Sequence, residues 1–407
     1  MSTRIVSGAP TRVGAGPDRS VPTPGRPIGT WTLSGVALTA IGGPLALGAL
    51  YGPAIVEDVG ASAGLISVAA VVAFGVPLLI WLRYAKHINS AGGLYSFVEA
   101  AAGRPVALVQ AGVWVVSYVL YLLSTTGQIV HDTLPDVWSG VGPWQSFLEV
   151  AIPLGLAAVM IAGRTATLAA TSLLAAGQLV LLGIVDVMSV GHAAPATSFV
   201  LQDGAAPVAT AAARTSLLYV CASLPLFLGG EVRRPQRAMP RALVGAWLVT
   251  AVGVGAAVFP LAHDPAFAHA DIPGMSVVRQ FGSAGLGTTI GIGVAVSIGG
   301  VMLVEYLALT RLLHAVTGRS ARTWTFALAG LLAVVAPLSL IDPDAFYDNL
   351  LRPSLFALWA SQLIVFAVYP RFARKVGDRV VPASVLAALG CAFAVYGGYV
   401  VWSHTGS

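Results

Sequence analysis

The segment that decides the fold runs from Thr32 to Val56 and reads TLSGVALTAIGGPLALGALYGPAIV. It is apolar throughout and longer than the roughly 20 residues that a helix needs to cross a bilayer. Its centre carries Ile41-Gly42-Gly43-Pro44, where the proline removes a backbone donor and the two glycines weaken the helix further. The sequence therefore predicts a membrane helix that is interrupted at its midpoint.

A second apolar segment, Val208–Gly229, is interrupted in a similar way by Cys221-Ala222-Ser223-Leu224-Pro225. It is the sixth span of the chain, so it crosses the membrane in the opposite direction to the first. Interrupted helices at matching positions of two oppositely oriented halves are typical of inverted-repeat secondary transporters. The alternative, in which proline and glycine only kink the two helices, stays open because both residues are common in membrane helices.

The composition predicts an integral membrane protein. Apolar residues make up 57% of the 407 residues and charged residues 10%, against roughly 25% charged in a typical soluble domain. The apolar residues form continuous blocks, whereas the strands of membrane barrels alternate apolar and polar positions. We therefore predict an all-α membrane protein with eleven spans: Thr32–Val56, Gly64–Leu82, Val106–Val130, Trp144–Ala162, Leu168–Val190, Val208–Gly229, Ala242–Leu261, Thr288–Leu313, Trp324–Ile341, Leu350–Tyr369 and Val380–Trp402.

The basic residues predict the orientation. With the N-terminus inside, every Lys and Arg except Arg214, Arg279 and Arg352 lies on the cytoplasmic side, as the positive-inside rule requires. This topology accounts for the net charge of +5, which is therefore no evidence for a nucleic-acid partner. We expect a disordered cytoplasmic tail over residues 1–29 and one membrane domain over 30–403, in the cell membrane. The excess of Arg over Lys and the abundance of alanine favour a bacterial source with a GC-rich genome.

Three stretches of the chain resemble the amino acid–polyamine–organocation superfamily. They are Gly42-Gly43-Pro44-Leu-Ala-Leu-Gly48, Ala91-Gly92-Gly93-Leu-Tyr95 and Glu231-Val-Arg-Arg-Pro235-Gln-Arg-Ala-Met-Pro240-Arg241-Ala242. The third is similar to the family's acidic–x–x–x–Pro–x–x–x–x–Pro–Arg–Ala loop after span six. The resemblance implies the five-plus-five inverted-repeat fold of the bacterial leucine transporter, with discontinuous helices 1 and 6, and here one additional C-terminal helix.

The resemblance also implies a function. It predicts a secondary active transporter, a symporter or antiporter of amino acids or related small amine-bearing metabolites, driven by a proton or sodium gradient or by exchange. The departures from the family leave the substrate open, because Asn89 replaces the usual proline and Cys221-Ala222-Ser223 replaces the usual Gly-Phe-Glu. The alternative is a non-transporting nutrient sensor or receptor on the same scaffold. The predicted partners are a small molecule and the bilayer, and the sequence predicts no oligomeric state.

The sequence carries no enzyme signature. Motifs such as His-Glu-x-x-His, Gly-x-Ser-x-Gly and the phosphate-binding Gly-x-x-x-x-Gly-Lys do not occur, and no cysteines are paired at metal spacing. We therefore predict neither an enzyme nor a resident metal or cofactor, beyond a possible coupling ion, H⁺ or Na⁺. His131 and Asp132 are expected on a solvated outer loop.

The candidate substrate-binding residues come from the two interruptions and from span three. They are Ile41, Gly42, Gly43, Leu45, Tyr118, Tyr121, Cys221, Ala222 and Ser223. Glu305 and Ser297, both in span eight, are the candidates for ion coupling. A carboxylate at that depth is costly unless it faces a cavity or a partner, so Glu305 is either a coupling site or half of an ion pair near the inner surface. For each tyrosine, packing with the hydroxyl on a backbone carbonyl is the alternative.

Overall fold

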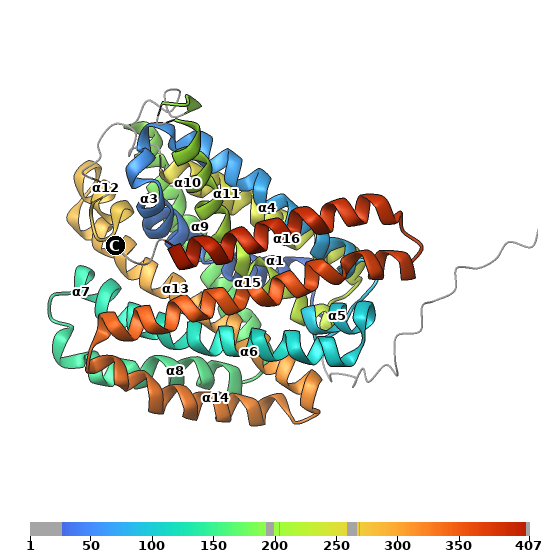
Figure 1. The fold of residues 1–407 in the computed structure, drawn as a ribbon. Coiled ribbons are helices and arrows are strands. Elements are labelled where there is room, and N and C mark those ends of the chain that lie inside the picture. Colours follow the sequence, from blue (N-terminus) through green and yellow to red (C-terminus); the bar gives the residue numbers. More distant parts are fainter. Residues whose placement is uncertain (1–26, 193–198, 203, 259–266, 268, 404–407) are drawn as a thin grey trace, which may run out of the picture.

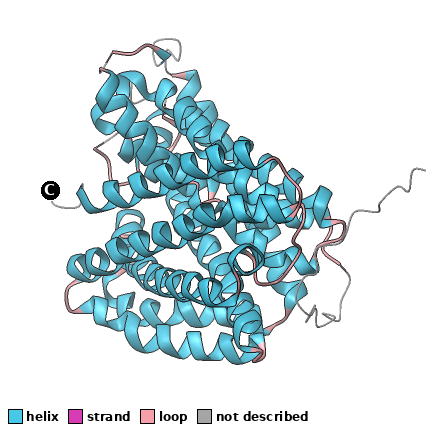
Figure 2. Cartoon of the chain, turned by 45° about the vertical axis from the view of Figure 1, so that its right-hand side comes forward, coloured by secondary structure: helices cyan, strands magenta, loops and turns pink. Residues whose placement is uncertain are grey.

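The computed structural model describes residues 27–192, 199–202, 204–258, 267 and 269–403; most of the predicted tail, 1–26, lies outside them. The described part is built from helices joined by short connections (Figure 2). Within it, eleven helices are long and apolar enough to cross a membrane: Thr30–Ile55, Ala63–Ala85 (α4), Arg104–Val137, Gly142–Ile161, Arg164–Gly191 (α9), Ala205–Glu231, Pro235–Ala257 (α11), Ala284–Thr317 (α13), Ala321–Leu340, Pro343–Lys375 (α15) and Val380–Ser403 (α16). The predicted eleven spans are confirmed, and the chain is a multi-pass membrane protein.

Two spans begin earlier than predicted by a wider margin than the others, each at a proline. The seventh begins at Pro235 and not at Ala242, and the tenth begins at Pro343 and not at Leu350. Proline is tolerated in the first helical turn because the N–H that it lacks would have no partner there. Asp342 caps the tenth span, since its Oδ1 accepts a hydrogen bond of 3.0 Å from the N–H of Ala345.

The first span is interrupted where the sequence predicts. Helix α1 (Thr30–Ala40) ends before Gly42 and Gly43, whose φ angles of 108° and 69° are positive. These angles suit glycine and disfavour other residues. The chain resumes as α2 (Pro44–Ala46), the π-helical segment η1 (Leu47–Tyr51) and α3 (Gly52–Ile55). At Gly43 a side chain would also collide with the hydroxyl of Ser297, so this glycine allows span one to approach α13 closely.

The sixth span changes its helix type instead of opening. Helix α10 (Ala205–Leu217) passes through Leu218 and Tyr219 into η6 (Val220–Glu231), a 3₁₀ helix of 12 residues. Runs of 3₁₀ helix beyond three or four residues are uncommon, and in mid-helix they often mark a hinge or strain. The two interruptions are therefore unequal, because only span one has lost its helical backbone.

The spans form a bundle with α1 near its centre. Helix α1 packs against α9, α11, α13 and η6, whereas α16 packs mainly along α15 and α4 at the side of the bundle (Figure 1). Helices α8 (Gln145–Ile161) and α14 (Ala321–Val335) lie side by side along another edge. The arrangement is that of ten core helices with α16 as the additional one. Two short helices, α5 (Leu94–Ala102) and α12 (Pro273–Phe281), lie between spans.

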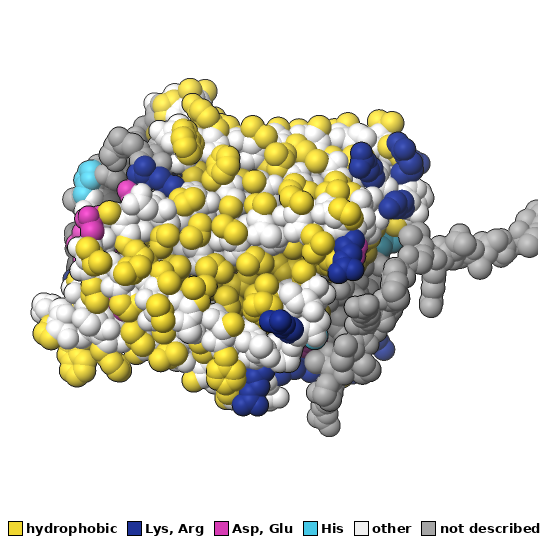
Figure 3. Space-filling view, turned by 60° about the horizontal axis from the view of Figure 1, so that its bottom comes forward, with side chains coloured by type: hydrophobic (Ala, Val, Ile, Leu, Met, Phe, Trp, Pro, Cys, Tyr) yellow, Lys and Arg dark blue, Asp and Glu magenta, His cyan; other side chains and the backbone are white. Residues whose placement is uncertain are grey.

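The surface has the charge distribution of a membrane protein. On the face shown in Figure 3, apolar side chains cover the middle, most Lys and Arg side chains gather at the right-hand end, and most of the visible Asp and Glu side chains lie at the left-hand end beside a few Lys or Arg side chains. We call the first of these the basic end; it holds the start of α9 and the last turns of α13 and α15. The other, acidic end holds the last turn of α16.

Candidate functional site

A cavity of about 200 Å³ lies between spans one, three, six, ten and eleven, in the half of the bundle toward the acidic end. Its wall is mainly aliphatic and aromatic. The lining residues are Gly42, Leu47, Tyr51, Ser117, Tyr118, Tyr121, Gln128, Leu217, Leu218, Val220, Cys221, Tyr347, Leu351, Leu355, Leu358, Trp359 and Val401. Both interrupted spans contribute, span one through Gly42 and span six through Cys221.

Two π-helical segments bring polar groups into this cavity. Tyr51 is the last residue of η1, and Gln128 is the first residue of η3 (Gln128–Thr133), which continues α6 (Arg104–Gly127) in span three. The Tyr51 hydroxyl donates a hydrogen bond of 2.8 Å to Gln128 Oε1. A π-helical turn shifts the register of the side chains that follow it, and such turns are frequent at functional sites. The contact joins spans one and three near the acidic end.

A chain of weak donors leads from the cavity to Glu305. The Tyr118 hydroxyl lies 4.0 Å from Cys221 Sγ, and Cys221 Sγ lies 3.7 Å from Glu305 Oε1. The Glu305 side chain is fully buried, and its Oε2 has no hydrogen-bond partner within the described residues. The nearby basic residue of the same helix, Arg311, pairs with Glu231 and not with Glu305. The ion-pair alternative for Glu305 therefore receives no support from the structure.

Aromatic rings separate the cavity from the basic end. The ring of Trp114 packs on Tyr118 at a centroid distance of 4.0 Å and on Phe227 at 4.6 Å. Trp114 and Phe227 are fully buried. Trp114 lies one turn closer to the basic end than Tyr118 on α6, so these rings block the direct path from the cavity in that direction.

Ion pairs join the spans beyond the aromatic rings. Glu231, at the end of η6, has one carboxylate oxygen 2.7 Å from Arg311 Nε of α13 and the other 2.7 Å from Arg164 Nε of α9. The segment before α1 is tied to the same place, because the N–H of Ile28 donates to the Glu231 carbonyl at 2.8 Å and the Ile28 carbonyl accepts from the N–H of Arg233 at 2.8 Å. These contacts hold spans one, five, six and eight together at the basic end.

The structure divides the residues predicted for substrate binding. Gly42, Tyr118, Tyr121 and Cys221 line the cavity. The other predicted residues are buried but do not appear in its wall; they are Ile41, Gly43, Leu45, Ala222 and Ser223. Their positions at the interruptions explain the difference, since successive residues of a turn point to different sides.

Ser297 lies at a separate polar contact behind span one. Its hydroxyl accepts a hydrogen bond of 3.2 Å from the N–H of Ala46 and donates one of 2.9 Å to Gln178 Oε1 of α9. All three groups are buried. Ser297 therefore joins spans one, five and eight, and it does not line the cavity.

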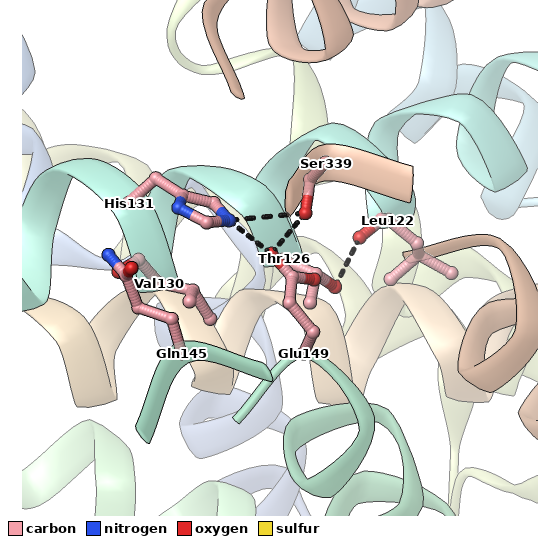
Figure 4. Close-up of polar contacts among 7 residues, drawn as sticks. All are labelled: Leu122, Thr126, Val130, His131, Gln145, Glu149 and Ser339. Carbon is pink, nitrogen blue, oxygen red and sulfur yellow. Dashed lines mark hydrogen bonds and ion pairs between the residues drawn. The ribbon is translucent and has the colours of Figure 1, made fainter. Parts of the chain in front are cut away.

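The expectation that His131 is solvated is wrong. His131 lies in η3, and its Nε2 is 2.8 Å from Glu149 Oε1 of α8 and 3.1 Å from the Ser339 hydroxyl (Figure 4). The Ser339 hydroxyl also donates to Glu149 Oε1 at 2.5 Å, from η9 (Ala336–Leu340) in span nine. Glu149 is fully buried, as Glu305 is. Sequence reasoning missed this contact because 190 residues separate Glu149 from Ser339.

The fold was compared with known proteins, and solved structures resemble it. No protein-family model matches the chain, and no curated protein matches it. The structure of MhsT in complex with L-phenylalanine superposes with a TM-score of 0.64 at 15% sequence identity, covering 90% of this chain and 97% of that one. The substrate-bound outward-open state of a Na⁺-coupled sialic acid symporter gives 0.58 at 10% identity, covering 91% and 89%. The predicted fold of the bacterial leucine transporter is thereby confirmed.

Proposed function

We propose that this chain is a secondary active transporter that moves amino acids or related small amine-bearing metabolites across the cell membrane by alternating access. One observation carries the proposal. The cavity lies between the two interrupted spans and is separated from the basic end by buried rings and by the ion pairs of Glu231. Alternating access needs a central cavity between the interrupted spans that is closed toward one side of the membrane at a time.

The matched structures support this proposal at the level of the fold. One holds L-phenylalanine, and the other is a symporter of sialic acid, so the fold accommodates small metabolites of different chemistry. The basic end takes the cytoplasmic side in the proposed topology, because cytoplasmic ends of membrane proteins are rich in Lys and Arg. The cavity then belongs to the outer half of the membrane in this proposed topology of a bacterial cell-membrane protein.

Glu305 is the proposed ion-coupling residue. An ionised carboxylate in the membrane needs a proton, a cation or a basic partner to compensate its charge, and no basic side chain of the described residues forms an ion pair with Glu305. A proton or a sodium ion can fill this need. Ser297 is the weaker candidate, because its hydroxyl already bonds to Ala46 and Gln178.

Uptake into proteoliposomes tests the proposal. Purified protein is reconstituted and offered a panel of labelled amino acids and amines under an imposed proton gradient, an imposed sodium gradient, or an internal load of unlabelled substrate. Accumulation or exchange above that of protein-free liposomes is expected for at least one compound. Ligands that bind to the purified protein but are neither accumulated nor exchanged would contradict transport and favour a sensor on the same scaffold.

A further inference from the structure

A groove on the outside of the bundle lies between spans five and seven. Its volume is about 400 Å³, and it shares no lining residue with the cavity between the interrupted spans. The lining residues come equally from α9 and α11; they are Leu179, Leu182, Gly183, Asp186, Leu248, Val249, Val252 and Gly253. Val252 is 72% exposed and Leu248 46%. Because both helices are membrane spans, the groove opens toward the lipid.

One acidic side chain, Asp186, interrupts the apolar wall of this groove. Its Oδ1 atom is buried and has no hydrogen-bond partner within the described residues, and none of the basic side chains described forms an ion pair with it. Its Oδ2 atom is directed toward α11, where a Cβ atom at Gly253 would lie 3.5 Å away. A carboxylate in a membrane span needs a partner that compensates its charge. Asp186 therefore calls for a positive group inside the groove.

The polarity of the groove changes along its length. Asp186 lies five residues before the end of α9, toward the acidic end of the bundle, whereas Leu179 lies two turns closer to the basic end. At 1.5 Å per residue, the 28 residues of α9 span about 42 Å, against about 30 Å for the hydrocarbon core of a bilayer. The carboxylate therefore lies near the headgroups, and the aliphatic part of the groove lies among the acyl chains.

This arrangement suits an amphipathic ligand that lies parallel to the lipids. Its head would be at the membrane surface beside Asp186, and its chain would follow the aliphatic side chains of α9 and α11. A positive head compensates the carboxylate, whereas an anionic head is repelled and a neutral chain leaves the charge without a partner. The volume of about 400 Å³ falls within the roughly 300–1,000 Å³ of small-molecule sites, so one aliphatic chain suffices to fill it.

We propose that this groove binds an amphipathic organic cation from the membrane, an ammonium group on a single aliphatic chain, with the ammonium group at Asp186. The site is distinct from the proposed transport site and does not depend on the proposed function. Leu182 connects the two regions, because a side chain at Gly48 of η1 or at Gly253 would collide with it. A ligand in the groove therefore contacts a side chain that packs on span one.

Paired photoreactive probes that differ only in the head group test this proposal. Full-length protein in nanodiscs of digalactosyldiacylglycerol, a neutral lipid without an ammonium group, receives dodecyltrimethylammonium or dodecanol, each with a diazirine in its chain. Labelled peptides are identified by mass spectrometry. We expect saturable labelling within residues 179–186 and 248–253, at least fivefold stronger for the ammonium probe. Equal labelling by both probes would overturn the preference for a cation, and labelling that does not saturate would overturn the site.

Two variants test the head and the chain of the ligand separately. Asp186→Asn keeps the size of the side chain and removes its charge, so labelling by the ammonium probe should fall at least fivefold and labelling by the dodecanol probe should stay unchanged. Gly183→Leu fills the groove and should also lower labelling by the ammonium probe at least fivefold. A Cβ atom at Gly183 meets no heavy atom within 4 Å, so this variant is expected to fold.

Two control variants should be labelled as the wild type is. Gly177→Leu adds the same side chain to α9 at a glycine that has equally open space but does not line the groove. Glu305→Gln changes the acid beside the cavity between the interrupted spans, so it shows whether the probe binds there instead. All variants are compared with the wild type by elution volume and thermal melting. Undiminished labelling of folded Asp186→Asn or Gly183→Leu protein would overturn the proposed site.

Discussion

Two buried glutamates of the membrane spans, Glu149 and Glu305, have opposite surroundings. Both are fully buried. Glu149 is bonded to His131 at 2.8 Å and to Ser339 at 2.5 Å, so a basic group and a hydroxyl share one of its oxygens. Glu305 Oε1 has only the Cys221 thiol at 3.7 Å, and the Oε2 atom of each glutamate has no hydrogen-bond partner among the described residues. The same side chain at similar burial is thus supplied with partners in one place and left almost without them in the other.

The difference separates a structural acid from a functional one. A buried carboxylate that is paired and hydrogen-bonded is compatible with the folded state in the absence of any ligand. One without such partners calls for a proton or a cation from outside the protein, and it lies beside the cavity. The positions of the two glutamates agree with these roles. Glu149 joins spans three, four and nine, whereas Glu305 contacts the 3₁₀ segment of span six.

The largest expected effect is that of Glu305→Gln on gradient-driven transport. The neutral amide can neither bind and release a proton nor supply the negative charge that holds a sodium ion, so accumulation should fall to the level of protein-free liposomes. Exchange at saturating substrate should persist, because it needs no net ion movement. Both are measured in the same proteoliposomes, with Glu149→Gln as the matched control. Undiminished accumulation in the Glu305→Gln variant would show that Glu305 does not take part in ion coupling.

The second effect concerns stability. His131→Ala removes one of the two partners of the buried Glu149 Oε1, and a buried polar group that loses its partner costs about 1–3 kcal/mol. A lower melting temperature is expected, and it should be partly recovered in His131→Ala/Glu149→Gln, where an amide replaces the carboxylate that lost its partner. Thermal unfolding of the detergent-purified variants measures both. If the His131→Ala single variant were as stable as the wild type, the contact between His131 and Glu149 would have no structural role.

A third, smaller effect is expected at the basic end. Glu231→Gln removes the charge that holds Arg164 and Arg311, so it should favour opening toward the cytoplasm. Labelling of the Cys221 thiol measures this opening. The measurement uses a Cys391→Ser background, in which Cys221 is the only cysteine in the chain. A membrane-impermeant thiol reagent added at the cytoplasmic side should label it about fivefold more in the variant, as a shift of about 1 kcal/mol gives. Unchanged labelling would mean that the ion pairs do not control this path.

The smallest effect is that of Ser297→Ala. It removes the hydroxyl between Ala46 and Gln178 and should cost about 1 kcal/mol of stability, the usual size of a hydrogen bond. Substrate accumulation should change little, because Ser297 does not line the cavity. Gradient-driven uptake by the Ser297→Ala variant tests this directly. Loss of uptake in this variant would show that Ser297 takes part in ion coupling, and it would weaken the contrast between the glutamates.

The sequence predicts the parts of this fold that depend on local composition. Continuous apolar blocks give the eleven spans, and Gly42-Gly43-Pro44 gives the interruption of span one, because glycine and proline act on the backbone where they stand. It does not predict that span six tightens into a 3₁₀ helix, since the choice depends on its packing against α1, α4 and α13. Tyr347 was also missed, because the tenth span begins at Pro343, earlier than hydropathy suggests.

Contacts between distant spans cannot be predicted from local composition. The pairing of His131 with Glu149 depends on η3, whose π-helical turns set the direction of the His131 side chain. The Tyr51–Gln128 hydrogen bond needs a π-helical segment in each of two spans. Neither segment has a distinctive composition. The partners of a buried side chain are therefore the part of the site for which the three-dimensional structure was needed.

The most direct test of the central claim is a measurement of coupling-ion movement, of protons and of sodium. Proteoliposomes that enclose a pH-sensitive dye or a sodium-sensitive dye are given substrate, and the internal ion concentration is followed for the wild type, Glu305→Gln and Glu149→Gln. If Glu305 is the coupling residue, substrate moves one of the two ions in the wild type and in Glu149→Gln, whereas Glu305→Gln exchanges substrate without moving either ion. Ion movement that survives in Glu305→Gln, or is lost in Glu149→Gln alone, would contradict this role.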